Sequence, residues 1–247
     1  MTAPLAAPAP RPARVEELQA RIRGMQATRL DSKAVPTHPA LEAVLPGGTL
    51  HEGTVVQVEG STTLLMALLA GPSASGRWVA VAGMPEFGVE AAARFGISLD
   101  RLVLVPDPGR QWLTVVAALA DVIPVVAVRP AGRVSPAETS RLQARLRQRG
   151  TTLLVTGEWP GSDARLGVEA SQWQGIEWGH GRLVEREVVV SAAGRGEFVR
   201  SIHSRLRLPG RSLEFAAVDA GADDGEIAEP IRIGEVAIGE FERRATG

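Results

Sequence analysis

One segment of the sequence has residue types that could bind a phosphate group. It consists of Gly60, Ser61, Thr62 and Thr63, and it lies between a run of β-branched residues and a leucine-rich stretch. A nucleotide-binding loop needs a glycine-rich span whose N–H groups surround the phosphates, a lysine for their charge and a hydroxyl for Mg²⁺. This segment has the hydroxyls but neither a second glycine nor a lysine, because Lys33 is the only lysine in the chain. We therefore interpret it as a degenerate phosphate loop, in which Ser61 or Thr62 caps a helix.

The composition excludes several other kinds of chemistry. The 247 residues include no cysteine, which removes thiolate nucleophiles, disulfides and cysteine-ligated zinc. Four histidines are scattered without the spacing that places two ligands on one helix face: His38, His51, His180 and His203. No triad or carboxylate pair stands out, so we expect no catalytic residues, no metal and no cofactor. The sequence shows neither a secretory signal nor an unbroken apolar span, which favours a cytoplasmic protein without membrane contact.

An alternation of strand-like and helix-like segments predicts an α/β fold with a mostly parallel sheet between about Leu41 and Pro209. The expected strands are Thr54–Glu59, Arg77–Ala82, Leu102–Val105, Val122–Val128 and Thr151–Thr156. The expected helices are Thr62–Ala70, Val89–Phe95, Gln111–Leu119 and Pro136–Arg149, the last with Ser135 as its N-cap. Residues Trp173–Trp178 and Arg182–Val190 flank Gly179-His180-Gly181 and predict an antiparallel hairpin.

Three regions follow from this pattern. Residues 1–40 form an N-terminal arm with one amphipathic helix, whose apolar face is predicted to carry Val15, Leu18, Ile22 and Met25. Residues 41–210 form the α/β core. Residues 211–247 form an acidic, partly flexible tail, which begins with a possible strand at Ser212–Val218. From Ser212 onward the tail has nine acidic and three basic residues, a net charge of −6.

Arginines are clustered after the fourth expected strand, where they could bind single-stranded DNA. Arg129 and Arg133 lie in the loop that follows this strand. Arg141, Arg145 and Arg149 recur every four residues on the expected helix Pro136–Arg149 and form what we call the arginine stripe. Such a stripe could follow phosphates electrostatically, with strong salt dependence and little sequence preference. A solvated helix face would have the same pattern, and the sequence leaves both interpretations open.

The acidic tail contains apolar residues that could dock on a partner protein. They are Ile231, Ile233, Val236, Ile238 and Phe241. These residues are too few for an independent core, but they suffice for a short segment that becomes ordered on contact. A tail that only increases solubility is the alternative.

Several segments, in their order along the chain, resemble the RecA recombinase family. Leu45 to Thr63 resembles the entry to the family's first core strand and its P-loop. Glu90 to Val105 resembles the family's second helix leading to its third strand. Asp121 to Val128 resembles the Walker B strand, and Arg149 to Thr156 the next core strand. The resemblance covers about Leu41 to Ser191 and implies a RecA-like core.

The same resemblance implies that the catalytic positions of the family are lost. The metal-associated acidic residue would fall near Ala127, and the catalytic glutamate near Met84. Glu86 lies two positions farther on and is interpreted as a solvated loop residue. A RecA-like fold without a working P-loop is therefore expected rather than an active ATPase.

An arginine-rich, lysine-poor chain of this length resembles the actinobacterial ImuA-prime group of mutasome accessory proteins. The segment from Trp173 to Leu183 and the later Gly194-Arg195-Gly196 carry this part of the resemblance. It implies a non-catalytic scaffold in SOS-induced translesion synthesis, with an ImuB-like inactive Y-family polymerase homologue as partner. Single-stranded DNA and a second copy of the chain are further possible partners. The alternative is a cell-division inhibitor of the SulA type, which also has a RecA-like fold.

Overall fold

The computed structural model describes residues 34–177, 180–194 and 202–218. One sheet contains nine strands: β3 (Val55–Glu59), β4 (Val79–Ala82), β5 (Leu102–Val105), β6 (Val125–Val128), β7 (Thr152–Thr156), β8 (Ala164–Glu177), β9 (His180–Gly194), β10 (Ile202–Arg207) and β11 (Ala216–Ala217). Their order across the sheet is β11-β10-β9-β8-β3-β7-β6-β4-β5. Pairing is parallel from β8 through β3 to β5, and antiparallel from β8 to β11. The predicted α/β class with a mostly parallel sheet and a C-terminal antiparallel hairpin is therefore confirmed.

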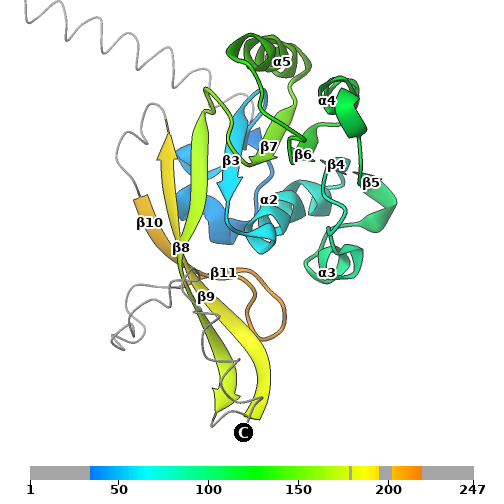
Figure 1. The fold of residues 1–247 in the computed structure, drawn as a ribbon. Helices are drawn as coiled ribbons and strands as arrows, with labels where there is room; N and C mark the ends of the chain where they lie inside the picture. Colours follow the sequence, from blue (N-terminus) through cyan, green and yellow to red (C-terminus); the bar gives the residue numbers. More distant parts are fainter. Residues whose placement is uncertain (1–33, 178–179, 195–201, 219–247) are drawn as a thin grey trace, which may run out of the picture.

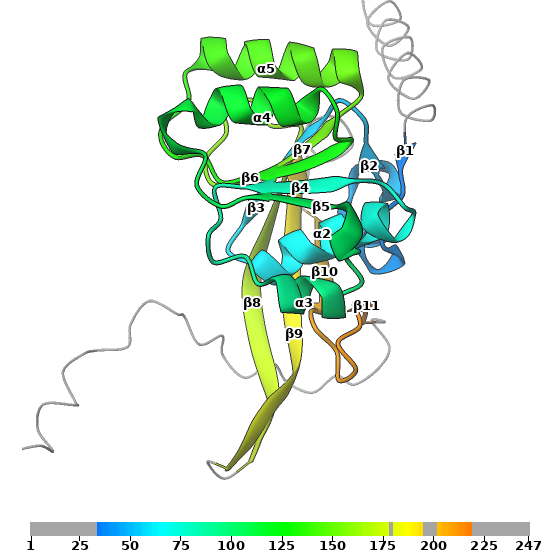
Figure 2. The ribbon, with the colours of Figure 1, turned by 90° about the vertical axis from the view of Figure 1, so that its right-hand side faces the viewer.

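Helices cover both faces of the parallel part (Figure 2). Helices α2 (Thr62–Ala74) and α3 (Val89–Arg94) lie on one face, and α4 (Trp112–Ala120) and α5 (Pro136–Arg149) lie on the other. Successive strand residues point to opposite faces, so Val55 packs with α4 and α5 while Val56 packs with α2. Burial on both faces explains why these strands are almost continuous aliphatic runs.

Short elements complete the fold. They are β1 (Ala34–Val35), η1 (Pro39–Val44), η2 (Pro46–Gly48), β2 (Leu50–His51), η3 (Leu99–Arg101) and η4 (Gly109–Gln111). β1 pairs with β2, and η1 contacts β9, β10 and β11. The expected core limits at residues 41 and 210 fall inside the folded region, since β1 precedes the first and β11 follows the second.

The predicted helices and parallel strands are found with small differences in their ends. The bounds of β5 and α5 agree with the prediction, and α5 begins with a capping box between Ser135 and Glu138. Helix α2 continues through Pro72 to Ala74, and both Pro72 and Ser73 are buried. Strand β6 starts three residues later than predicted, because Val122 and Ile123 donate backbone hydrogen bonds to Leu119 and prolong the turn after α4.

The antiparallel part differs more from the prediction. β8 and β9 are longer than the predicted hairpin strands, and β10 was not predicted. Register shifts between Val168 and Ala170, and between Gln174 and Ile176, interrupt the alternation that reveals a strand. The predicted strand Ser212–Val218 is reduced to β11, because a turn closed by Gly210 and Glu214 comes first.

The hairpin of β8 and β9 extends beyond the helices (Figure 1). Charged side chains anchor it to its neighbours. The Glu185 carboxylate on β9 is buried, and its oxygens lie 2.8 Å from Arg207 Nε and 3.0 Å from Arg211 Nε. Backbone hydrogen bonds join Arg186 to Leu208 and Pro209. Strand β9 is thus tied, at Glu185 and Arg186, both to β10 and to the segment that follows it.

Candidate functional site

The connection between β3 and α2, where a phosphate loop would lie, is two residues long. Gly60 has a positive φ of 72°, and Ser61 is the N-cap of α2. Ser61 Oγ accepts a hydrogen bond of 3.1 Å from the backbone N–H of Leu64. Thr62 is exposed in the first turn, and Thr63 follows it. A connection of this length presents no ring of N–H groups, because the chain turns directly from the strand into a capped helix.

The carboxyl ends of β4 and β6 form the second place where an open α/β sheet could bind a ligand. The chain leaves β4 toward α3 on one face and leaves β6 toward α5 on the other, which is a topological switch point. Here Arg129, directly after β6, forms an ion pair with Glu86 in the loop after β4. Gly83 allows this close approach, because a Cβ at this residue would lie 2.4 Å from the Arg129 carbonyl oxygen.

Glu86 is exposed in the loop after β4, as expected, and its carboxylate also forms the ion pair with Arg129. Both side chains are about half exposed, but the carboxylate is held by the guanidinium. Hydrogen bonds from the Glu86 backbone and from Arg129 hold the pKa of the Glu86 carboxyl below its usual value. The two charges compensate each other, so neither group is a free general base or a free phosphate ligand.

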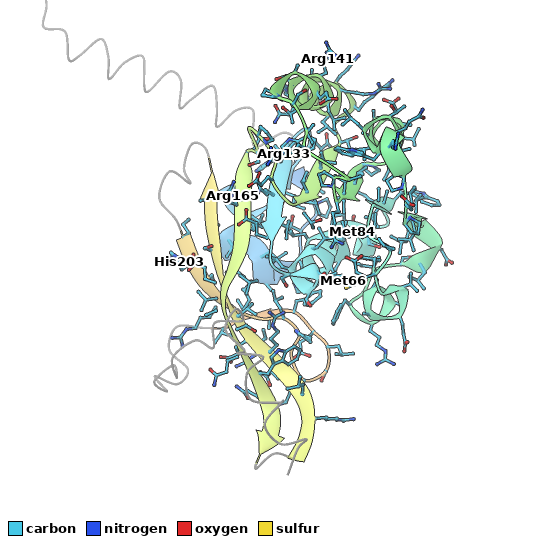
Figure 3. All side chains as sticks on the ribbon, viewed as in Figure 1. Met66, Met84, Arg133, Arg141, Arg165 and His203 are labelled. Carbon is cyan, nitrogen blue, oxygen red and sulfur yellow. The ribbon has the colours of Figure 1, made fainter. Side chains whose placement is uncertain are left out.

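A polar cluster that the sequence analysis did not single out lies at the end of β3. Gln57 is fully buried and donates a hydrogen bond of 2.7 Å from Nε2 to Glu59 Oε1. Arg165 on β8 lies 3.4 Å from both Gln57 Oε1 and Glu59 Oε1. Figure 3 labels Arg165 on β8, the strand beside β3. The single polar residue inside the aliphatic run of β3 was the signal that could have revealed this cluster.

The arginine stripe on α5 is partly neutralised by one carboxylate. Arg145 Nε lies 2.7 Å, and Arg149 Nε 3.1 Å, from Asp121 Oδ1 at the end of α4. A hydrogen bond from Arg145 is the main cause that lowers the pKa of the Asp121 carboxyl, and the same contact raises the pKa of Arg145. This arrangement joins α4 to α5 and reduces the positive charge that the stripe offers to a phosphate.

Two of the predicted DNA-contacting arginines remain available. Arg133 lies exposed in the β6–α5 loop and Arg141 in the second turn of α5, and neither has a salt bridge within the described residues (Figure 3). The predicted set is therefore divided, since Arg129, Arg145 and Arg149 are ion-paired and Arg133 and Arg141 are not.

The remaining expectations concern the two ends of the chain, metal binding and membrane-spanning helices. The amphipathic segment from Val15 to Met25 and the tail residues Ile231, Ile233, Val236, Ile238 and Phe241 lie outside the described residues. Across residues 34–177, 180–194 and 202–218, no group of three or more His, Cys, Asp or Glu side chains could hold a metal ion. No helix in these ranges has the length and apolar character needed to cross a membrane.

The part of the chain that contains these sites is similar to known proteins. Residues 43–161 match the family model described as the MT3502 N-terminal domain. The chain is 37% identical over 135 residues to the uncharacterized protein Rv3395c of Mycobacterium tuberculosis, and this similarity covers 53% of the chain and 66% of that relative. The chain thus matches just under two thirds of the relative's length. The family match extends from η1 to the loop after β7, so it includes the β3–α2 connection, the Glu86–Arg129 pair and α5, and residues 43–161 are similar to an MT3502 N-terminal domain.

Proposed function

We propose that this protein is a non-catalytic accessory protein with a RecA-like core, acting in the cytoplasm in SOS-induced translesion synthesis. The strand segments that resemble RecA core strands correspond to β3, β5, β6 and β7, and all four lie in the parallel part of one sheet. A helix follows each of the first three, as the resemblance implies. This arrangement supports the RecA-like part of the proposal.

The proposal that the protein is non-catalytic rests on the residues at the sheet edge where a nucleotide would be expected to bind. The β3–α2 connection has two residues and no lysine. The resemblance implies an acidic residue near Ala127 in β6, but this position is uncharged and the first charged residue after it is Arg129. This arginine, Arg129, is bound to Glu86, the acidic residue nearest to the expected catalytic position. A bound triphosphate would find neither an N–H cradle nor a compensating lysine.

The proposed partner is an ImuB-like inactive Y-family polymerase homologue, bound through the acidic tail. The tail is the part of the chain with apolar residues set among acidic ones, and these cannot form a core of their own. A direct test is a pull-down of the tagged chain from DNA-damaged cells, scored for polymerase homologues and for division proteins.

A matched variant separates the tail from the core. Deletion from Gly221 onward should abolish capture of the polymerase homologue and leave the thermal unfolding of the core nearly unchanged, since the last described strand ends at Ala217. Capture of the tubulin-like division protein in its place would favour the SulA-type alternative. Loss of core stability in the truncated chain would contradict a docking role for the tail.

Weak binding of single-stranded DNA is the second part of the proposed role. The unpaired Arg133 and Arg141 supply its first contacts, and Asp121 competes with phosphates for Arg145 and Arg149. Fluorescence anisotropy with a labelled oligonucleotide should show salt-sensitive binding that weakens in a variant with Arg141→Ala and Arg145→Ala. Asp121→Asn should strengthen binding and steepen the salt dependence, by a slope of roughly 0.7 for each arginine released to a phosphate. Salt-independent binding, or no response to these variants, would exclude the arginine stripe.

A further inference from the structure

Strand β5 ends the nine-stranded sheet, and its outer side is unpaired within the described part of the chain. β5 pairs only with β4, from Leu102 beside Val79 to Val105 beside Ala82. The carbonyl of Val105 accepts a hydrogen bond from Gly83 and so points toward the interior of the sheet. Because backbone groups of successive strand residues alternate in direction, those of Leu102 and Leu104 point outward.

Within the four residues of β5, this edge has no charge, no proline and no bulge to prevent pairing with another strand. Natural sheets protect their edges with charged residues, prolines, bulges or very short strands. The sequence of β5 is Leu-Val-Leu-Val, without a charge or a proline, and its register with β4 is regular. The opposite edge of the sheet differs, since β11 has two residues and contacts η1.

Apolar side chains around β5 are unusually exposed. Leu104 within the strand is 36% exposed, and Leu99 in the preceding η3 turn is 47% exposed. Trp78, directly before β4 and beside Arg101 in the extended register, is 48% exposed. The edge therefore combines free backbone groups with apolar surface, which is the combination that β-strand addition uses.

The charges that flank β5 are opposite in sign and make the edge complementary to itself. Arg101 precedes the strand and Asp107 follows it after Pro106. In an antiparallel pair of two such strands with Leu104 opposite Leu104, each Arg101 lies opposite the second copy's Asp107. The two Leu104 residues exchange their outward hydrogen bonds, and Leu102 N–H meets the Pro106 carbonyl. Pairing Leu102 with Leu104 instead would place Asp107 opposite Leu99, so charge favours the first register.

We propose that β5 is a homodimer interface, at which two copies of this chain join their sheets by antiparallel β5–β5 pairing centred on Leu104. Because the two copies are related by a two-fold axis, each hydrogen bond and each Arg101–Asp107 pair occurs twice in the interface. A four-residue strand therefore contributes twice the number of contacts that it would make once. This inference rests on the edge itself and does not depend on the function proposed above.

Sedimentation velocity of the full chain, over about two decades of concentration, tests the dimer. Leu104→Lys places two like charges opposite each other and should weaken the dimer at least tenfold. Ile202→Lys is the matched control, because Ile202 is an aliphatic strand residue with a nearly equal exposure of 37% at the far side of the sheet. It should leave the dimer unchanged.

Exchanging the charges at residues 101 and 107 tests the proposed register, in which Leu104 lies opposite Leu104. This test is informative even if Leu104→Lys does not fold. Asp107→Arg should weaken the dimer by about fivefold, and the double variant Arg101→Asp with Asp107→Arg should restore it. Arg101 also donates a hydrogen bond to the Gly76 carbonyl, and Asp107 Oδ1 accepts one of 3.0 Å from Gly109 N–H, so thermal unfolding of each variant is measured alongside. A monomer at all concentrations, a dimer equally sensitive to Ile202→Lys, or a folded double variant that does not recover would each overturn the proposal.

Discussion

The parallel and antiparallel parts of the sheet are stabilised in different ways. Every residue of β4 and β6 is buried, between helices on both faces, and none of them is polar. In β8, β9 and β10 one face packs against the core, and the other carries charged side chains, among them Glu187 and Arg207. The difference shows that one continuous sheet can depend on hydrophobic burial at one side and on paired charges at the other.

The same difference separates the two candidate ligand sites. At the end of β3 the polar cluster of Gln57, Glu59 and Arg165 lies against the antiparallel part, where side chains are polar and partly exposed. At the ends of β4 and β6 two aliphatic strands lead to one ion pair, Glu86 with Arg129. In both places the charges compensate each other, which is consistent with the accessory role proposed above.

The largest expected effect follows from removing aliphatic volume in the parallel part. Leu154 of β7 is fully buried, so Leu154→Ala should lower the free energy of unfolding by about 3 kcal/mol through lost burial and the cavity left behind. Urea unfolding gives this value. Leu183→Ala on the projecting hairpin, where the side chain is 50% exposed, is the control and should change it by no more than about 0.5 kcal/mol. Equal losses for the two variants would contradict the distinction between the two parts.

A smaller effect is expected from neutralising the buried carboxylate of the antiparallel part. Glu185→Gln keeps the shape but leaves Arg207 and Arg211 without their shared anion, and should cost about 2 kcal/mol. Glu187→Gln is the matched control on the same strand, because its contact with Arg207 is longer, at 3.4 Å, and more exposed. If both variants unfold at the same urea concentration as the parent, charge pairing does not stabilise this part.

The pH dependence of stability should reveal the Asp121 contact between α4 and α5. Because the folded protein lowers the pKa of this carboxyl below its ordinary value of 3.8, the carboxylate stabilises the fold above that pH. The contribution is lost as the pH falls through the lowered pKa. The parent should therefore exceed Asp121→Asn in stability near neutral pH, and the two should converge in acid. Arg145→Gln removes the main cause of the lowered pKa of Asp121. In this background, Asp121→Asn should therefore cost less stability near neutral pH, as measured by unfolding followed by circular dichroism.

The smallest expected effect is the response to nucleotide. Because Gly60 and Ser61 form the whole β3–α2 connection, Mg-ATP should neither raise the melting temperature nor give heat in a calorimetric titration. Low-micromolar affinity would contradict the interpretation of this edge. It would also require a ligand site other than the capped start of α2.

The sequence by itself determined the parallel part of the fold. Continuous aliphatic runs such as Leu102–Val105, and the capping residues Ser135 and Glu138 of α5, act locally, so their signals are visible without knowledge of the neighbours. The sequence also sufficed to interpret Gly60 to Thr63 as a degenerate phosphate loop, because the missing lysine and the short loop are properties of composition and spacing. These features need no tertiary contact to be recognised.

Only the tertiary structure decided which charged residues are available. Glu86 and Arg129 lie 43 positions apart, and Asp121 is 24 positions from Arg145, so their pairing depends on adjacent strands and helices and not on local spacing. The bulges in β8 also hid the true length of the hairpin, because each shift moves the following side chains to the other face. The exposure of the β5 edge belongs to the same class, since a strand's place in the order of a sheet is a property of the whole fold and not of its own four residues.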